Sequence, residues 1–145
     1  MIAKPNALAS YGRVANAETD RLQQIVMLYD GAIRFLRLAA RSIETGDLQT
    51  KAEQTNRALD VIAYLQAILD FERGGDVART LDHLYNQVAA LVLRASATLD
   101  AETMRRAADL LVPVRDAWCQ IRSGSNNSLP LNGEAFSAPR ATAQP

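Results

Sequence analysis

The sequence predicts an all-α protein, an antiparallel up-down four-helix bundle with flexible N- and C-terminal tails. Between residues 32 and 123, glycine and proline occur only at Gly46, Gly74, Gly75 and Pro113. Apolar residues recur there with the i, i+3, i+4, i+7 spacing of one buried helical face. The connections between these long segments are short, which favours antiparallel neighbours in a bundle.

The two ends of the chain differ from its middle. Residues 124–145 are rich in Gly, Pro, Ser and Asn and have no periodic apolar face, so this tail is predicted to be disordered. Residues 1–17 are interpreted as a flexible N-terminal arm. The remaining segment, 18–123, is predicted to be a single bundle domain, as a chain of 145 residues suggests.

The first helix is expected to run from Asp20 to about Thr45. Asp20 is a plausible N-cap, and Gln23 is placed to complete a capping box. Three arginines, Arg34, Arg37 and Arg41, share a second face, interpreted as solvated rather than as a site for an acidic partner. The expected buried face consists of Leu22, Ile25, Val26, Tyr29, Ala32, Ile33, Leu36, Ala40 and Ile43.

The second helix is expected to start at Asp47, directly after Gly46, and to end near Glu72. Its segment 58–69, ALDVIAYLQAIL, is apolar over most of its circumference. A helix in a four-helix bundle keeps one side toward solvent. Part of this apolar surface is therefore expected to be exposed or covered by another chain.

The glycine pair Gly74–Gly75 is predicted to form the turn between the second and third helices. Two glycines inside a helix would cost roughly 2 kcal/mol relative to alanines. At least one is expected to have a positive φ, with Asp76 capping the third helix, which ends near Leu99. A phosphate-binding loop is a poor alternative, because the sequence has neither a preceding strand nor a Gly-Lys-Ser/Thr ending.

The fourth helix is expected to span residues 101–121, with Asp100 as its N-cap. Pro113 lies inside this span and is expected to kink the helix, because it cannot donate to the carbonyl of Asp109.

The sequence offers few groups for catalysis or metal binding. His83 is the only histidine and Cys119 the only cysteine, and both are interpreted as ordinary bundle residues. We therefore predict no enzyme activity, no catalytic residue, no cofactor and no metal. The formal net charge is zero, which gives no electrostatic case for binding nucleic acid or an anionic membrane. No segment approaches the ~20 apolar residues of a membrane span, so membrane insertion is not expected.

Five blocks of the chain resemble the FliS family of flagellar export chaperones, over roughly Tyr11 to Gly124. They are the tyrosine at position 11, MLYDGAIRFL (27–36), ETGDLQTKAEQTNRALDVI (44–62), LDFERGGDVARTLDHLYNQV (69–88) and DAWCQI (116–121). Three features depart from the family pattern. ETDR at 18–21 replaces a Thr/Ser-Ala-Ser-Pro segment, Arg57 stands where the family has lysine, and Pro113 in the fourth helix is unusual for the family.

This resemblance implies a chaperone of the bacterial cytosol. Its client would be the disordered C-terminal segment of flagellin, which wraps around the bundle, is kept from premature polymerisation and is delivered to the flagellar type III export apparatus. The resemblance also implies that Tyr11 shields the client groove when flagellin is absent. An amphipathic segment docking on apolar grooves is a common recognition mode. The expected flagellin contacts are Leu59, Ile62, Ala63, Gln66, Leu69, Leu81, Tyr85 and Val88.

Two alternatives remain open at this point. In the first, the client of the chaperone is a protein other than flagellin. In the second, the protein is a structural bundle that buries its second helix in a homodimer.

Overall fold

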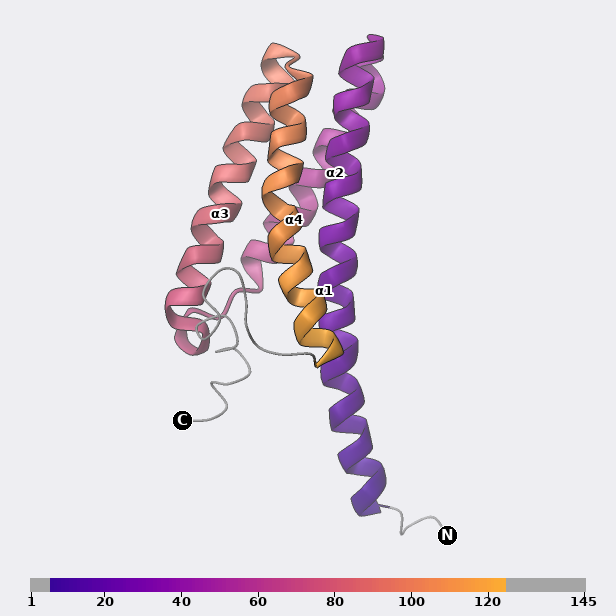
Figure 1. Cartoon of the computed structure of the whole chain (residues 1–145), viewed down its shortest axis with the longest axis vertical. Helices are drawn as coiled ribbons and strands as arrows, with labels where there is room; N and C mark the ends of the chain where they lie inside the picture. Colours follow the sequence, from indigo (N-terminus) through magenta and orange to yellow (C-terminus); the bar gives the residue numbers. More distant parts are fainter. Residues whose placement is uncertain (1–5, 125–145) are drawn as a thin grey trace.

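Figure 1 shows the computed structural model of the chain, which describes residues 6–124 and the side chains of residues 17 and 20–124. Within this part the structure has four helices: α1 (Asn6–Thr45), α2 (Leu48–Ala67), α3 (Phe71–Thr98) and α4 (Ala101–Ser123). Helices α1 and α3 run in one direction and α2 and α4 in the other (Figure 1). The all-α, antiparallel up-down bundle that the sequence predicts is confirmed.

The core follows one face of each helix. Helix α1 packs mainly against α2 and α4, and α3 packs against the same two helices, so α1 and α3 lie on opposite corners of the bundle. The largest completely buried side chains come from all four helices. They are Tyr29, Tyr85, Leu36, Ile62, Met104, Leu111, Val88 and Val92.

Helix α1 begins much earlier than the sequence predicts. It starts at Asn6, so the prediction of a start at Asp20 is wrong, and Asp20 lies inside the helix. The segment before Asp20 has Ala at four of its positions from 7 to 17 and no proline, and alanine has the highest helix propensity. The first turns of α1 extend past the ends of the other helices (Figure 1). Residues 1–5 and the tail 125–145 lie outside the described residues, and the division of the chain at 17 and 124 stays a prediction.

The connection between α2 and α3 lies before the glycine pair, not at it. Helix α2 ends at Ala67 rather than Glu72, and Asp70 is the N-cap of α3, accepting a hydrogen bond from the Arg73 backbone N–H at 3.0 Å. The predicted turn at Gly74–Gly75 is therefore wrong, because Asp70 already caps a helical turn before the glycines. Both glycines lie within α3.

A change of direction inside α3 explains the glycine at position 75. Gly75 has φ 50° and ψ −126°, and this single residue separates the first turn of α3 from its long remainder. The predicted positive φ is thus confirmed at Gly75. Asp76 has a different role from the predicted cap, since its carboxylate pairs with the guanidinium of Arg79 one turn later.

Two aspartates cap the other helices as the sequence predicts. Asp47 accepts a hydrogen bond from the Thr50 backbone N–H at 3.1 Å, and Asp100 accepts one from the Thr103 N–H at 3.0 Å. The pKa of Asp47 is lowered mainly by the Thr50 hydroxyl, which also donates to its carboxylate. The pKa of Asp100 is lowered mainly by the backbone N–H of Thr103. Both carboxylates therefore stay charged at the positive ends of their helices.

Ion pairs follow the seam between α1 and α4. Arg115 Nε donates to Asp30 Oδ1 at 2.6 Å, and Arg37 lies 3.6 Å from Asp109. Arg105 pairs with Glu44 nearer the opposite end of the seam. The side of α1 that carries Asp30, Arg37 and Glu44 is thus paired with α4. Exposed ion pairs of this kind each contribute little to stability.

Candidate functional site: an aromatic pocket beside the α2–α3 connection

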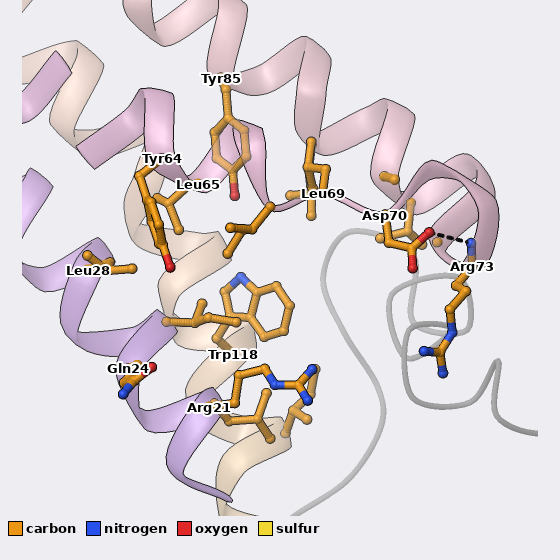
Figure 2. A pocket seen from close by; sticks show the side chains of 18 residues that line it. Arg21, Gln24, Leu28, Tyr64, Leu65, Leu69, Asp70, Arg73, Tyr85 and Trp118 are labelled. Atoms are coloured by element: carbon orange, nitrogen blue, oxygen red, sulfur yellow. Dashed lines mark hydrogen bonds between the residues drawn. The ribbon is translucent and has the colours of Figure 1, made fainter. Parts of the chain in front are cut away.

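A pocket of about 340 Å³ opens where α2 ends. Figure 2 shows its walls: the part of α1 that carries Arg21 and Leu28, the end of α2 with Tyr64 and Leu65, and the connection with Leu69 and Asp70. The start of α3 and the last turns of α4 complete the lining. Apolar side chains dominate the pocket, as is usual for sites that take a ligand or a partner segment.

The early end of α2 makes room for the pocket. Because α2 stops at Ala67, the last turns of α4 and the matching part of α1 have no α2 residues opposite them below that point. The wall on the α3 side includes two small residues, Gly74 and Ala78. A Cβ added at the buried Gly74 would meet the Ala78 Cβ at 3.0 Å, so a larger residue at position 74 would press on that wall.

Two aromatic side chains form the inner end of the pocket, and a third lies behind them. Tyr85 and Trp118 line it, and the Tyr85 hydroxyl is hydrogen-bonded to that of Tyr29 behind them. The Tyr29 and Tyr85 ring centroids are 6.3 Å apart at a tilt of 52°, within the range of favourable aromatic pairs.

Burial keeps both phenols protonated. It raises the pKa of Tyr29 to about 12, although hydrogen bonds with Tyr85 and Trp118 act in the opposite direction. Burial is also the main reason why the pKa of Tyr85 lies well above its usual value. At neutral pH the inner end of the pocket is therefore uncharged, with polar atoms already engaged with one another.

The outer part of the pocket carries positive charge. Arg21 of α1 and Arg73 of α3 both contribute to the lining. Figure 2 shows Arg21 below Trp118 and Arg73 farther off, beside Asp70. Among residues 20–124, the ion pairs that the structure contains involve neither of these arginines. Asp70 is the one carboxylate in the lining, and its oxygen accepts from the Arg73 backbone N–H.

Exposed apolar side chains continue from the pocket onto the surface. Tyr64 is 54% exposed, Ile68 46% and Phe71 48%. All three lie at the end of α2 or the start of α3, and we call them the apolar rim. Ile68 belongs to the apolar segment 58–69 of the sequence, and in the structure it is the C-cap of α2.

The predicted flagellin contacts fall into two groups. Four are buried in the core: Ile62, Leu81, Tyr85 and Val88. Leu59, Gln66 and Leu69 are half-buried, and Ala63 is exposed. Only Leu69, Leu81 and Tyr85 line the pocket. The eight residues therefore do not form one continuous surface in this conformation.

Gln66 ties α2 to α3. Its side-chain nitrogen donates to Asp82 Oδ1 at 2.7 Å and to Asn86 Oδ1 at 2.8 Å. A client segment that inserts between α2 and α3 at this point must break these hydrogen bonds.

Tyr11 belongs to α1, but its side chain lies outside the described residues. With 1.5 Å of rise per residue, a continuous helix places Tyr11 roughly 15 Å before Arg21 along the axis. The shielding role that the resemblance implies therefore requires α1 to unwind or bend between these residues, and it stays a prediction.

The pocket's charged and exposed members are the residues that sequence reasoning missed. One signal was available for Tyr64: it lies in the segment 58–69, which is apolar over most of its circumference, so some of its large side chains had to be exposed. Arg21 and Arg73 lie far apart in the sequence, and no local pattern indicates that they meet at one opening.

The remaining candidates for chemistry do not converge. His83 is exposed on α3 and Cys119 is half-buried on α4. Within the described part of the chain, no group of three or more His, Cys, Asp or Glu side chains is arranged to hold a metal ion. No helix in that same part is both long and apolar enough to span a bilayer.

Comparison with known proteins agrees with this architecture. Residues 4–125 match the family model described as flagellar protein FliS. The chain is 37% identical over 100 residues to the flagellar secretion chaperone FliS of Salmonella typhimurium, covering 68% of this chain and 74% of that one. It is 31% identical over 97 residues to the FliS chaperone of Vibrio cholerae (67% and 71% covered). It is 30% identical over 106 residues to FliSB of Pseudomonas aeruginosa (73% and 82% covered). The chain belongs to the FliS family of flagellar secretion chaperones.

Proposed function

We propose that this chaperone binds the C-terminal segment of flagellin, prevents its premature polymerisation and delivers it to the flagellar type III export apparatus from the bacterial cytosol. The observation that carries the proposal is the apolar rim beside the pocket, on a chain whose relatives are named as flagellar secretion chaperones. The protein then acts by binding alone and is not an enzyme.

The apolar rim suits a client that arrives without a fold of its own. Tyr64, Ile68 and Phe71 expose large side chains close to an apolar pocket, and a partly helical client segment can place side chains on both. Ordering such a segment costs free energy at the moment of binding. Affinity therefore has to come from many apolar contacts spread along the bundle, including the half-buried Leu59 and Leu69.

The direct test measures binding of purified flagellin by calorimetry, with intact flagellin and with flagellin lacking its C-terminal segment. Intact flagellin is expected to bind and the shortened form is not. Equal binding of the two forms would show that another part of flagellin carries the contact. Binding of neither would favour a client other than flagellin.

A substitution on the chaperone locates the surface. Ala63→Asp puts a charge on an exposed position of α2 next to Tyr64 and should weaken binding while the bundle stays folded. Ala52→Asp is the matched control, because Ala52 is also an exposed alanine of α2, but about three turns away near the start of the helix. If the two variants bind flagellin equally well, the surface on α2 is not the contact.

The oligomeric state of the free protein tests the remaining alternative. If the apolar rim is covered by a second copy, the mass measured in solution will correspond to a dimer, and Ala63→Asp will shift it toward the monomer.

A further inference from the structure

We propose that the chain's own C-terminal tail occupies the pocket when no client is bound, with the segment 129–136 as the occupant. The proposal concerns residues 125–145, which lie outside the described part of the chain. It requires only the isolated protein and does not depend on the identity of the client.

The tail starts at the edge of the pocket. Trp118 and Ile121, in the last turns of α4, are part of the lining. Gly124 ends α4 in the left-handed conformation with φ 75°, and its N–H bonds to the Ile121 carbonyl at 3.0 Å. A left-handed cap turns the chain away from the helix axis. From there, Leu129 is five residues away, a reach of up to about 17 Å.

The tail carries apolar side chains within that reach. The sequence SLPLNGEAF places Leu129 and Leu131 on either side of Pro130, followed by Phe136. Proline fixes its own φ and restricts the residue before it to extended conformations. Leu129 and Pro130 therefore lose little conformational entropy if they bind in an extended form, and proline-containing segments commonly dock on aromatic-lined grooves.

The pocket provides the matching surface. Its inner end is formed by Tyr85 and Trp118, with Tyr64 at the opening. A volume of about 340 Å³ is enough for a few apolar side chains. That is the low end of the range for ligand pockets, and too small for a complete helix. A segment that has no periodic face of its own can still be held there by a few side chains.

Charge complementarity sets the register. Glu134 is the only acidic side chain between residues 125 and 145, and it lies between the two apolar groups of the tail. Arg21 and Arg73 both line the pocket, and neither is engaged in an ion pair among residues 20–124. A carboxylate brought to this edge gains partners that the bundle itself does not supply.

The competing intramolecular occupant is the start of the chain. Residues 6–20 belong to the continuous helix α1, which leads away from the pocket past the end of the bundle (Figure 1). These residues reach the pocket only after α1 unwinds, whereas the tail starts beside it. We therefore assign the pocket to the tail.

Trp118 reports on the pocket in the full-length protein, because it is the only tryptophan. The test variant carries Leu129→Asp, Leu131→Asp and Phe136→Asp. Its matched control carries Ala138→Asp, Ala141→Asp and Ala143→Asp, which adds the same charge to the same tail. We expect the test variant to shift Trp118 emission to longer wavelength and to increase its quenching by acrylamide. The control should match the unaltered protein.

A charge exchange tests the register. Glu134→Arg alone should increase quenching, and Glu134→Arg combined with Arg73→Glu should reverse part of that increase. A synthetic peptide of residues 125–145, added to the test variant, should restore the emission of the unaltered protein.

Three results would overturn the proposal. The first is identical Trp118 emission and quenching in the unaltered protein, the test variant and the control. The second is an equal change in the control, which indicates an effect of charge alone. The third is quenching that depends on protein concentration but not on the tail substitutions, which assigns the pocket to a second copy of the chain.

Discussion

At the scale of single residues, Gly75 shows why this chain uses a glycine inside a helix. Its φ of 50° and ψ of −126° resemble the first central position of a type II′ turn, which strongly favours glycine. Apart from its chain neighbours and the nearby backbone of its own helix, no heavy atom lies within 4 Å of the place where a Cβ would stand. The requirement at this position is therefore the backbone conformation and not the available space.

Gly75→Val should lower the free energy of unfolding by about 1–2 kcal/mol, because a β-branched residue resists a positive φ. Urea unfolding followed by circular dichroism measures this change. Gly31→Ala is the control. Gly31 lies inside α1, and its added Cβ would meet the Phe35 ring at an ordinary 3.8 Å, so helix propensity should make that variant up to about 1 kcal/mol more stable. A neutral Gly75→Val would mean that this backbone is not fixed.

Tyr29 and Tyr85 make stability sensitive to alkaline pH. Burial raises the pKa of Tyr29 to about 12 and that of Tyr85 well above its usual value, whereas an unfolded tyrosine titrates near 10. Folding therefore favours the neutral phenols. Their contribution is fully present below about pH 10 and is lost as the pH rises toward 12.

Unfolding experiments between pH 9 and 12 should show this loss in the unaltered protein. The variant Tyr29→Phe/Tyr85→Phe is expected to lose less stability over the same interval, because it has no buried phenol to ionise. Parallel pH profiles for the two proteins would show that other groups cause the alkaline effect.

Prediction from sequence worked at single positions wherever burial follows helical period. In the third helix, Val77, Leu81, Tyr85, Val88 and Val92 recur at helical spacing, and the structure buries all five. The division of α2 between core and surface was not predictable in the same way. Its apolar residues surround the helix, so the periodic pattern does not distinguish the buried Ile62 from the exposed Tyr64.

At the scale of elements, the end of α2 determines where the pocket forms. Sequence reasoning placed the connection at the glycine pair, because glycines commonly end helices. The structure uses Asp70 as an earlier cap and keeps the glycines for a change of direction inside α3. Two valid local signals compete here, and in the structure the cap at Asp70 comes before the glycines.

Asp70→Ala should lower the free energy of unfolding by about 1 kcal/mol, the usual cost of removing an N-cap. Asp76→Ala is the informative comparison, because Asp76 makes an exposed pair with Arg79, and such pairs contribute little. Chemical denaturation of both variants measures the difference. If Asp76→Ala lowers the free energy of unfolding more than Asp70→Ala does, then Asp76 is the cap that matters for the stability of α3, as the sequence alone suggested.

At the scale of the whole molecule, the four helices and their directions were predictable and the site was not. Helix number and direction follow from local periodicity and short connections. The pocket combines α1, the α2–α3 connection and α4, so it depends on how distant segments meet. Trp118 illustrates the difference, since its place on a helical face was predictable and its place in the lining of the pocket was not.

Helix α1 couples the fold to client binding if Tyr11 shields the groove. The structure has this segment helical from Asn6, whereas shielding requires it to unwind before Arg21. The helical form and the unwound, shielding form of residues 6–20 then exclude each other, and the helix propensity of these residues sets the ratio of the two forms. Gly12→Ala favours the helical form by about 1 kcal/mol, which is roughly a fivefold change in the ratio. Ala15→Gly acts in the opposite direction.

We therefore expect Gly12→Ala to bind the C-terminal segment of flagellin more tightly than the unaltered protein, and Ala15→Gly to bind it less tightly. The effect is limited to about fivefold in either direction, because the substitutions change only the competing form and leave the contact surface intact. Calorimetric titration measures both affinities, and circular dichroism checks that the helical content changes as intended. Equal affinities for the two variants, with altered helical content, would show that the start of α1 does not compete with the client.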